Sequence, residues 1–131
     1  MKVVLDTNVL LAAIATHGLC DLVLTQCLQS HPLIISEPIL DELGRHLTGK
    51  FKMPPSQTSE IIKFIRSQST VVEPAEVAAG VCRDPNDLMV LGTALAGKAD
   101  CIITGEKDLL VIHPFCGIAI LSPRDFYQHI S

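Results

Sequence analysis

Four acidic positions stand at the ends of four different apolar segments of this chain, and they are the residues best suited to chemistry. They are Asp6, Glu42, Asp87 and the pair Glu106 and Asp108. A single carboxylate is costly to bury, so several carboxylates brought to one place imply a cation that neutralises them. The pattern therefore predicts a divalent-metal site of the kind that hydrolyses phosphodiester bonds.

Polar neighbours accompany two of these acids. Asp6 is followed by Thr7, which offers a hydroxyl, and by Asn8, whose amide can brace the turn. D-T-N is a common turn, so this triplet gains its meaning from the other acids. Before Glu106, Thr104 can hold a water or a carboxylate, and Gly105 allows a sharp turn of the backbone.

The other two acids have structural alternatives. Glu42 lies nearer than Asp41 to the apolar stripe of its helix, but a surface contact with Arg45 would also explain it. Asp84 precedes a proline and is predicted to cap a helix, which leaves Asp87 as the candidate ligand. Negative groups favour a helix N-terminus, so a structural role would account for both of these aspartates.

Short β-branched runs predict five strands, each separated from the next by room for at least one helix. They are Lys2–Leu5, Leu33–Ile35, Thr70–Val72, Cys101–Thr104 and Ile118–Leu121. Such spacing indicates parallel crossovers, and the near-continuous apolar runs indicate a sheet covered on both faces. The 131 residues are expected to form one domain of the α/β class, with Lys2–Leu5 central. Ligands bind such sheets at the carboxyl ends of the strands, where the acids stand.

Helices are predicted between the strands from caps and apolar spacing. One covers Cys20–Leu28, and the predicted N-caps of the others are Ser36, Ser56, Asp84 and Ser122. Gly49–Pro55 is predicted to be a mobile loop because it holds a glycine and two prolines.

The composition limits the classes of function. Apolar residues make up 48% of the chain and charged residues 18%, which indicates a well-buried globule. The net charge of −4 does not suggest nucleic-acid binding, but half of the basic residues lie between positions 45 and 66. Arg45, Lys50 and Lys52 are therefore candidates for contacts with phosphates, although a solvated helical surface would explain them equally well.

Other common sites are absent from the sequence. The five cysteines have no C-x-x-C spacing, so we expect reduced thiols rather than a zinc site or a disulfide framework. The histidines show no ligand spacing, and the sequence has no nucleotide-binding glycine loop and no G-x-S-x-G. With no export signal and no apolar run long enough for a membrane, the chain is expected to be cytoplasmic.

Three blocks of sequence, in their order and spacing, resemble the PIN-domain family of metal-dependent ribonucleases. They are LDTNVLLAA, ISEPILDELGRHL and RDPNDLMVLGTALAGKADCIITGEKDLL, and the resemblance spans essentially the whole chain. It looks most similar to the toxins of toxin–antitoxin pairs. The resemblance implies a three-layer α/β/α, Rossmann-like fold, bound Mg²⁺ or Mn²⁺, and hydrolysis of single-stranded RNA. It also implies an antitoxin partner and a homodimer.

The resemblance also implies roles for individual residues. Catalysis falls to Asp6, Glu42, Asp87 and Glu106; metal binding to Asp6, Asp87, Glu106 and Asp108; and supporting roles to Thr7, Asn8 and Thr104. Glu106 departs from the family, which usually has an aspartate there. The extra methylene moves the carboxylate by roughly one bond length, and a misplacement of about 1 Å can cost about a hundredfold in rate.

Three alternatives compete with this interpretation. A phosphoaspartate phosphatase with Asp6 as nucleophile would want an acid two residues later, where Asn8 stands. A signalling receiver domain would want an aspartate after the middle strand, where Ser36 and Glu37 follow Ile35. A regulatory RNA-binding module of the PIN fold with little or no catalysis is suggested by Glu106 in place of aspartate.

Overall fold

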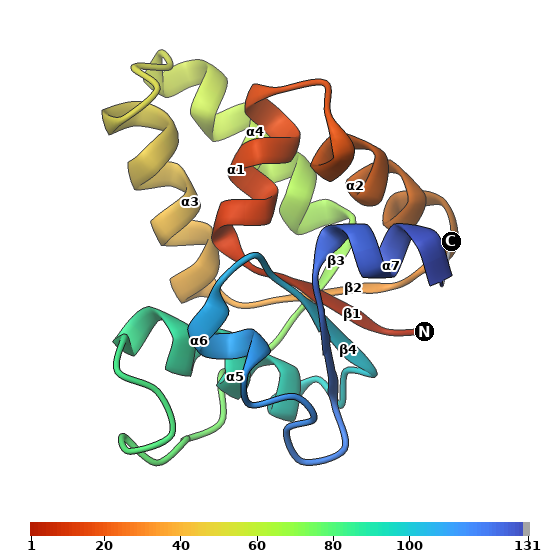
Figure 1. Cartoon of the computed structure of the whole chain (residues 1–131). Helices are drawn as coiled ribbons and strands as arrows, with labels where there is room; N and C mark the ends of the chain where they lie inside the picture. Colours follow the sequence, from red (N-terminus) through yellow and green to blue (C-terminus); the bar gives the residue numbers. More distant parts are fainter. Residues whose placement is uncertain (130–131) are drawn as a thin grey trace.

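Five short strands form one parallel sheet in the computed structural model of this protein, which describes residues 1–129 (Figure 1). The strands are β1 (Val3–Leu5), β2 (Leu33–Ile35), β3 (Ser69–Val71), β4 (Cys101–Ile103) and β5 (Ala119–Leu121). Their order across the sheet is β3-β2-β1-β4-β5, and every neighbouring pair is parallel. The predicted parallel sheet with a central first strand is confirmed.

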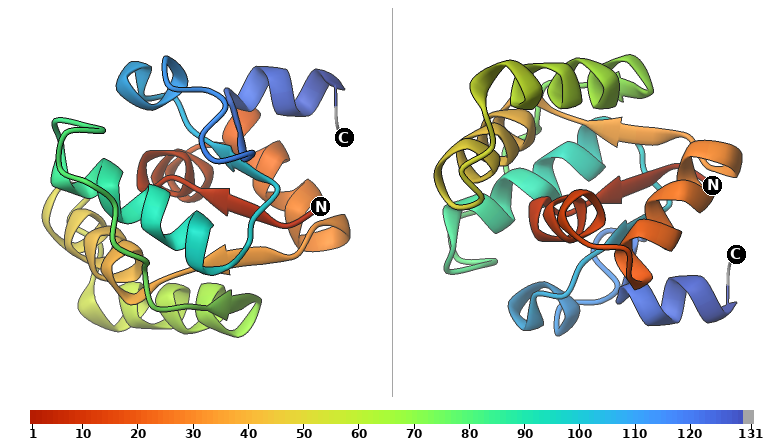
Figure 2. Two further views of the ribbon diagram at one scale, coloured as in Figure 1. Left: turned by 90° about the horizontal axis from the view of Figure 1, so that it is seen from below. Right: turned by 90° about the horizontal axis from the view of Figure 1, so that it is seen from above.

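Helices connect the strands and cover both faces of the sheet. They are α1 (Thr7–Ala15), α2 (Leu19–Ser30), α3 (Glu37–Gly49), α4 (Pro55–Ser67), α5 (Pro85–Ala96), α6 (Lys107–Leu110) and α7 (Pro123–His129). Figure 2 shows α5 in front of the sheet when the molecule is seen from below, whereas α1 and α2 lie in front of it when seen from above. The fold is therefore the expected three-layer α/β/α arrangement.

Burial explains why strands of only three residues form a stable sheet. Every residue of β1, β2 and β4 is buried, since helices lie over both faces of the middle of the sheet. The edge strand β3 is different, because Thr70 and Val71 are exposed. Continuous apolar runs therefore mark the middle of the sheet, as is usual for parallel sheets.

Two predictions about the helices need correction. The segment Thr7–Ala15 forms α1, which the sequence analysis did not predict, because apolar residues on all sides of the helix hide a helical period. Helix α4 begins at Pro55, after Pro54, so Ser56 lies inside its first turn rather than capping it. Proline is well suited to the first position of a helix because it has no backbone N–H to satisfy.

Two of the predicted caps are confirmed by hydrogen bonds, whereas the side chain of a third predicted cap, Ser36, bonds to a different partner. The Asp84 carboxylate accepts a hydrogen bond from the backbone N–H of Asn86 at 2.9 Å. Ser122 likewise accepts one from the N–H of Asp125 at 3.1 Å. Ser36 occupies the N-cap position of α3, but its buried hydroxyl bonds instead to that of Thr93 in α5, at 2.7 Å.

The segment between β3 and α5 lies against α5 at one close contact. The Ala75 N–H donates a hydrogen bond to the Gly92 carbonyl at 2.9 Å. A Cβ atom at Gly92 would stand 2.3 Å from the Ala75 carbonyl oxygen. Glycine at this position therefore allows the backbone of the preceding segment to pack directly on the helix that carries Asp87.

All five cysteine side chains are present as free thiols. Burial raises the pKa of Cys27 and of Cys101 to about 12, so both thiols are protonated. Within residues 1–129, no single helix is long and apolar enough to cross a membrane. The helices α1 and α2 reach that length and composition only together, across a bend of 105°.

Candidate metal centre

The predicted acids gather at the edge of the sheet where the parallel strands end. Helices α1, α3, α5 and α6 all begin beside this edge (Figure 1). Asp6 joins β1 to α1, Glu106 directly precedes α6, Asp87 lies in the first turn of α5, and Glu42 lies in the second turn of α3. We call these four residues, together with Asp108 of α6, the acidic edge.

Asp6 is buried, with 4% of its surface exposed, and it occupies the N-cap position of α1. The Thr104 hydroxyl donates a hydrogen bond of 2.7 Å to Asp6 Oδ2. The pKa of the Asp6 carboxyl is raised above its ordinary value of 3.8, mainly because the group is buried. The hydrogen bonds from Thr104 and from the Asn8 backbone lower this pKa in part, whereas the charges of Glu106 and Glu42 add to the rise. Asp6 is thus fixed in place and poorly stabilised as a bare anion.

Thr104 and Asn8 connect Asp6 to Glu106. The Thr104 hydroxyl accepts a hydrogen bond of 2.9 Å from the Glu106 backbone N–H while it donates to Asp6. The Asn8 side-chain amide donates to Glu106 Oε1 at 3.1 Å. Two of the three predicted supporting residues therefore hold the two acids in a fixed relation across the ends of β1 and β4.

Asp87 is the second buried acid, with 5% of its surface exposed. Burial, followed by the charges of Asp6, Asp84, Glu106 and Asp108, raises its pKa to about 6. No hydrogen bond counteracts these effects, in contrast to Asp6. The carboxyl of Asp87 therefore has the environment of a group that requires a cation or a proton.

Glu42 approaches the acidic edge from α3. It is partly buried, whereas its neighbour Asp41 is exposed, as the apolar stripe predicted. It lines a small crevice with Thr7 and Asn86, which lie at the starts of α1 and α5. Its charge is among those that raise the Asp6 pKa, so Glu42 lies within electrostatic range of Asp6.

Asp108 differs from the other acids because a basic side chain already holds it. Arg83 Nη2 donates to both of its carboxylate oxygens, at 3.2 and 3.1 Å. The predicted role of Asp108 as a metal ligand is therefore in competition with an ion pair. Sequence reasoning missed Arg83, although it stands directly before the Asp84-Pro85 helix start.

The donor set fits a hard divalent cation with several retained waters. The three ion pairs within residues 1–129 are His17–Asp21, Arg66–Glu37 and Arg83–Asp108, so no basic side chain neutralises Asp6 or Asp87 there. In the same part of the chain, no three His, Cys, Asp or Glu side chains are gathered as a ready metal-binding group. Mg²⁺ commonly binds through one or two carboxylates and keeps waters, so Asp6 and Asp87 suit it without a complete protein cage.

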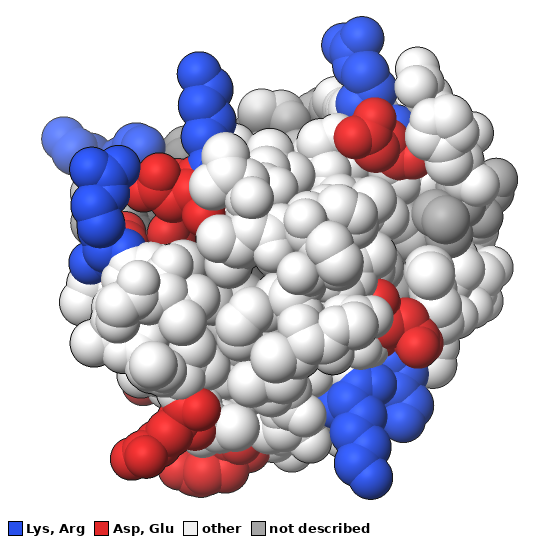
Figure 3. Space-filling model, turned by 60° about the horizontal axis from the view of Figure 1, so that its bottom comes forward, with Lys and Arg blue, Asp and Glu red and all other residues white. Residues whose placement is uncertain are grey.

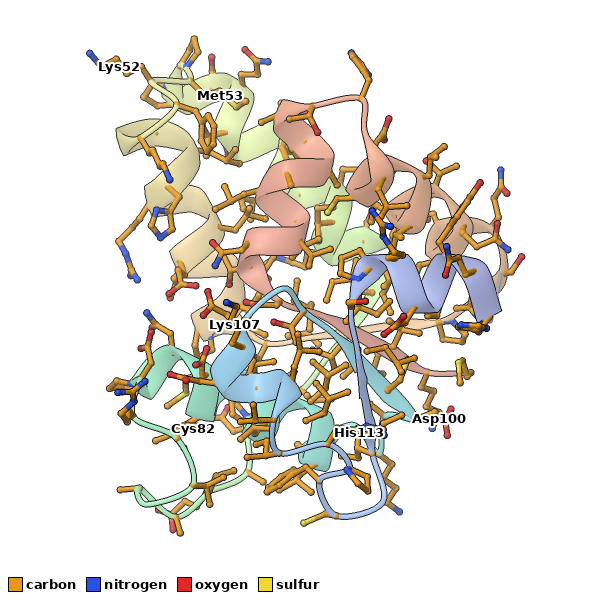
Figure 4. The ribbon with its side chains drawn as sticks, viewed as in Figure 1. Lys52, Met53, Cys82, Asp100, Lys107 and His113 are labelled. Atoms are coloured by element: carbon orange, nitrogen blue, oxygen red, sulfur yellow. The ribbon has the colours of Figure 1, made fainter. Side chains whose placement is uncertain are left out.

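The predicted phosphate-binding residues are exposed but lie in a different region. Lys50 and Lys52 follow the end of α3, where the Lys50 ammonium stands 5.9 Å from the centre of the Phe51 ring. Figure 4 shows Lys52 at one end of the molecule, well away from Lys107 beside the acidic edge. Arg45, one turn beyond Glu42, is nearer to the acids along α3. Figure 3 shows acidic atoms at the left edge of the molecule, with basic side chains standing around them.

Comparisons with known proteins agree with this fold. The PIN domain family model matches residues 2–108. A solved structure of VapBC2 from Rickettsia felis, bound to a DNA fragment from its promoter, is similar with a TM-score of 0.66 at 19% identity. The match covers 93% of this chain and 98% of that one.

Two further solved structures have similar scores. VapBC-1 from nontypeable Haemophilus influenzae has a TM-score of 0.65 at 19% identity, over 95% of this chain and 99% of that one. DNA-bound VapBC from Salmonella typhimurium has a TM-score of 0.64 at 17% identity, over 94% and 98%. At these identities the likeness concerns the fold. No curated protein matches the sequence significantly.

Proposed function

This chain belongs to the PIN domain family, and we propose that it is a ribonuclease that uses Mg²⁺ or Mn²⁺ to hydrolyse phosphodiester bonds of single-stranded RNA. The observation that carries the proposal is the pair Asp6 and Asp87. Both carboxylates are buried at the acidic edge, both have a raised pKa, and neither has a basic partner within residues 1–129. Such groups are stabilised as anions by a bound cation.

Four residues of the acidic edge then have a role in holding the ion or the attacking water. Asp6 and Asp87 would coordinate the ion directly, and Glu106 would contact the ion through a coordinated water. When bound, the ion supplies a water of lowered pKa and positive charge for the phosphate oxygens. Thr104 keeps the Asp6 carboxylate in one orientation through its hydrogen bond of 2.7 Å. Glu42, which lies on α3 within electrostatic range of Asp6, would orient the attacking water or accept its proton.

The experiment is an RNA cleavage assay on the purified protein. Single-stranded RNA is incubated with Mn²⁺, and in parallel with Mn²⁺ and excess chelator, using the wild type and Asp6→Asn. We expect cleavage only by the wild type with free Mn²⁺. Equal cleavage by Asp6→Asn, or cleavage that persists with the chelator, would refute the assignment of the acidic edge as the catalytic site.

A second candidate function is a PIN-fold module that binds RNA for regulation with little or no catalysis. Two observations support it: Glu106 is tied to Asn8 at 3.1 Å, and no three acids of the described chain form a ready metal group. Isothermal titration with Mn²⁺ distinguishes the two functions. The ribonuclease should bind the ion in a manner that depends on Asp6, whereas the regulatory module should bind it weakly or not at all.

The biological setting is part of the same proposal. We propose a cytoplasmic toxin that is inhibited by an antitoxin protein and forms a homodimer. The resemblance of the sequence blocks supports this setting, as does the fold likeness to solved VapBC structures. A small neighbouring gene that encodes a DNA-binding motif should yield a protein that co-purifies with this chain and suppresses its cleavage of RNA. Light scattering on the purified chain would test the homodimer.

A further inference from the structure

Arg83 connects two sides of the acidic edge. It lies in the segment before α5, and its Nη2 group donates to both carboxylate oxygens of Asp108 in α6. The Arg83 side chain is nevertheless 89% exposed, whereas that of Asp108 is 43% exposed. The guanidinium is thus tethered at one nitrogen and open to solvent on its other side.

A nucleic-acid substrate needs positive charge close to the acidic edge. Asp6, Asp87 and Glu106 present negative charge there, and they repel the phosphates of an approaching strand. Two of the three predicted basic residues do not meet this need, because Lys50 and Lys52 lie beyond the end of α3; the third, Arg45, lies on α3 one turn beyond Glu42 and has no ion pair within residues 1–129. Of the basic residues in the described chain, Arg83 is the one that forms an ion pair with a member of the acidic edge.

We propose that Arg83 binds a phosphate of the RNA strand that flanks the phosphate at Asp6 and Asp87, and that Asp108 positions it for this contact. The proposal rests on the proposed ribonuclease function. Arginine presents a planar set of five N–H donors, and the bonds to Asp108 use only Nη2. The donors on Nε and Nη1 are left to form the paired hydrogen bonds that guanidinium groups make with phosphate oxygens.

The exposure of Arg83 decides which phosphate it contacts. A group acting on the reacting phosphate would be desolvated between the acids, whereas Arg83 stands at the rim with most of its surface in water. Arg83 is therefore a substrate-binding residue, and its loss should weaken binding of the strand without changing the chemical step. Asp108, in turn, fixes the guanidinium at the rim instead of serving as a direct metal ligand.

The first test is the salt dependence of RNA binding. A labelled single-stranded RNA is titrated with wild type, Arg83→Gln and Lys2→Gln in the presence of a chelator, and the dissociation constant is measured at several salt concentrations. Each phosphate contact contributes roughly 0.7 to the slope of log affinity against log salt for a single strand. Arg83→Gln should lose about one such contribution. Lys2→Gln removes an equal charge at the opposite edge of the sheet and should keep the wild-type slope.

The second test is steady-state cleavage with Mn²⁺. Arg83→Gln should raise KM by roughly tenfold and leave kcat unchanged, which is the effect of losing binding that is equal in the ground and transition states. Arg83→Lys keeps the charge but loses the planar pair of donors, so its KM should lie between those of the wild type and Arg83→Gln. The melting temperatures should agree closely, because an exposed ion pair contributes little to stability.

The outcomes separate this proposal from the proposed function. If the wild type cleaves RNA and Arg83→Gln has the wild-type slope and KM, the role of Arg83 is refuted while the ribonuclease stands. A fall in kcat without a change in KM would also refute it, because the residue would then act on the chemical step. If Arg83→Gln loses about one contribution to the binding slope but the wild type never cleaves RNA, the ribonuclease function is refuted and the phosphate contact made by Arg83 is retained.

Discussion

Asp87→Asn removes one negative charge from the acidic edge with almost no change in side-chain size, and it should make the protein more stable at neutral pH. The pKa of Asp87 is raised to about 6 by burial and by the charges of Asp6 and Asp84, among others. The native protein therefore keeps this proton up to about pH 6, whereas the unfolded chain releases it near pH 4. Because the native state binds more protons between these values, the stability of the metal-free wild type falls as the pH rises through this window.

The size of the effect follows from the raised pKa. The difference between 3.8 and about 6 corresponds to about 3 kcal/mol at neutral pH. Water at the edge of the site screens part of this, which reduces the cost of the charge to about 1–2 kcal/mol. The charge also interacts favourably with the N-terminus of α5, and asparagine loses about 0.5 kcal/mol from that source. A net gain of about 1 kcal/mol remains, or roughly 3–4 °C in melting temperature.

The assay is urea unfolding of the wild type and Asp87→Asn in chelator, at pH 4 and at pH 7. The asparagine variant should be more stable at pH 7 and show no advantage at pH 4, where the wild-type carboxyl is protonated. Asp84→Asn is the control, since asparagine caps a helix nearly as well as aspartate. It should preserve folding and cleavage and lower the Asp87 pKa slightly, because the Asp84 charge contributes to raising it.

RNA cleavage by the same variant completes the test. Asp87→Asn should lose at least about a hundredfold of the Mn²⁺-dependent activity, the scale expected when a reacting group is misplaced. A variant that is no more stable than the wild type at pH 7 would refute the argument that Asp87 is an uncompensated charge. Comparable cleavage by the two proteins, where a chelator abolishes it, would show that Asp87 does not hold the ion.

Three further predictions concern other parts of the molecule. Millimolar Mg²⁺ or Mn²⁺ should raise the melting temperature of the wild type but not that of Asp6→Asn, because only the former retains both buried carboxylates; equal stabilisation would count against the site. Thr104→Val removes the hydroxyl that lowers the Asp6 pKa. When Mn²⁺ binding is measured as a function of pH, binding by this variant should therefore begin at a higher pH than binding by the wild type; the same starting pH for both proteins would contradict this. Gly92→Ala places a Cβ atom 2.3 Å from the Ala75 carbonyl oxygen and should destabilise the protein by about 1–3 kcal/mol in urea unfolding; a stability equal to that of the wild type would show that the segment shifts freely.

The sheet could be predicted from the sequence because its signal is local and strong. Runs such as VVL, LII and CII consist of apolar residues with a preference for strands, and the long connections between them require parallel pairing. The positions of the acids at the carboxyl ends followed directly from this topology. Helix α1 was missed for the opposite reason, since Val9, Leu10, Leu11 and Ala13 are all buried and the helix has no polar stripe to reveal its period.

The pairings of side chains could not be predicted in the same way. Arg83 and Asp108 are 25 residues apart and meet only because the segment before α5 passes beside α6. Charge clustering along the sequence favoured residues 45–66 as the phosphate-binding region, yet Arg66 is occupied by Glu37 and Lys52 lies far from the acids. Charge density along the chain is a poor guide to the field at a site, because that field depends on which cations the fold brings near the carboxylates.

The hydrogen bonds at the ends of β1 and β4 offer a physical account of Glu106 in place of the family's usual aspartate. Asn8 reaches Glu106 Oε1 from α1, while Thr104 accepts from the Glu106 backbone and donates to Asp6. A longer side chain can meet the Asn8 amide and still remain beside Asp6, whose pKa it raises. Glu106 is therefore held beside Asp6 by one hydrogen bond at its carboxylate and another at its backbone N–H. Glutamate keeps the negative charge that a cation requires at this corner of the sheet. Replacing aspartate by glutamate therefore alters the position of the carboxylate but not its charge.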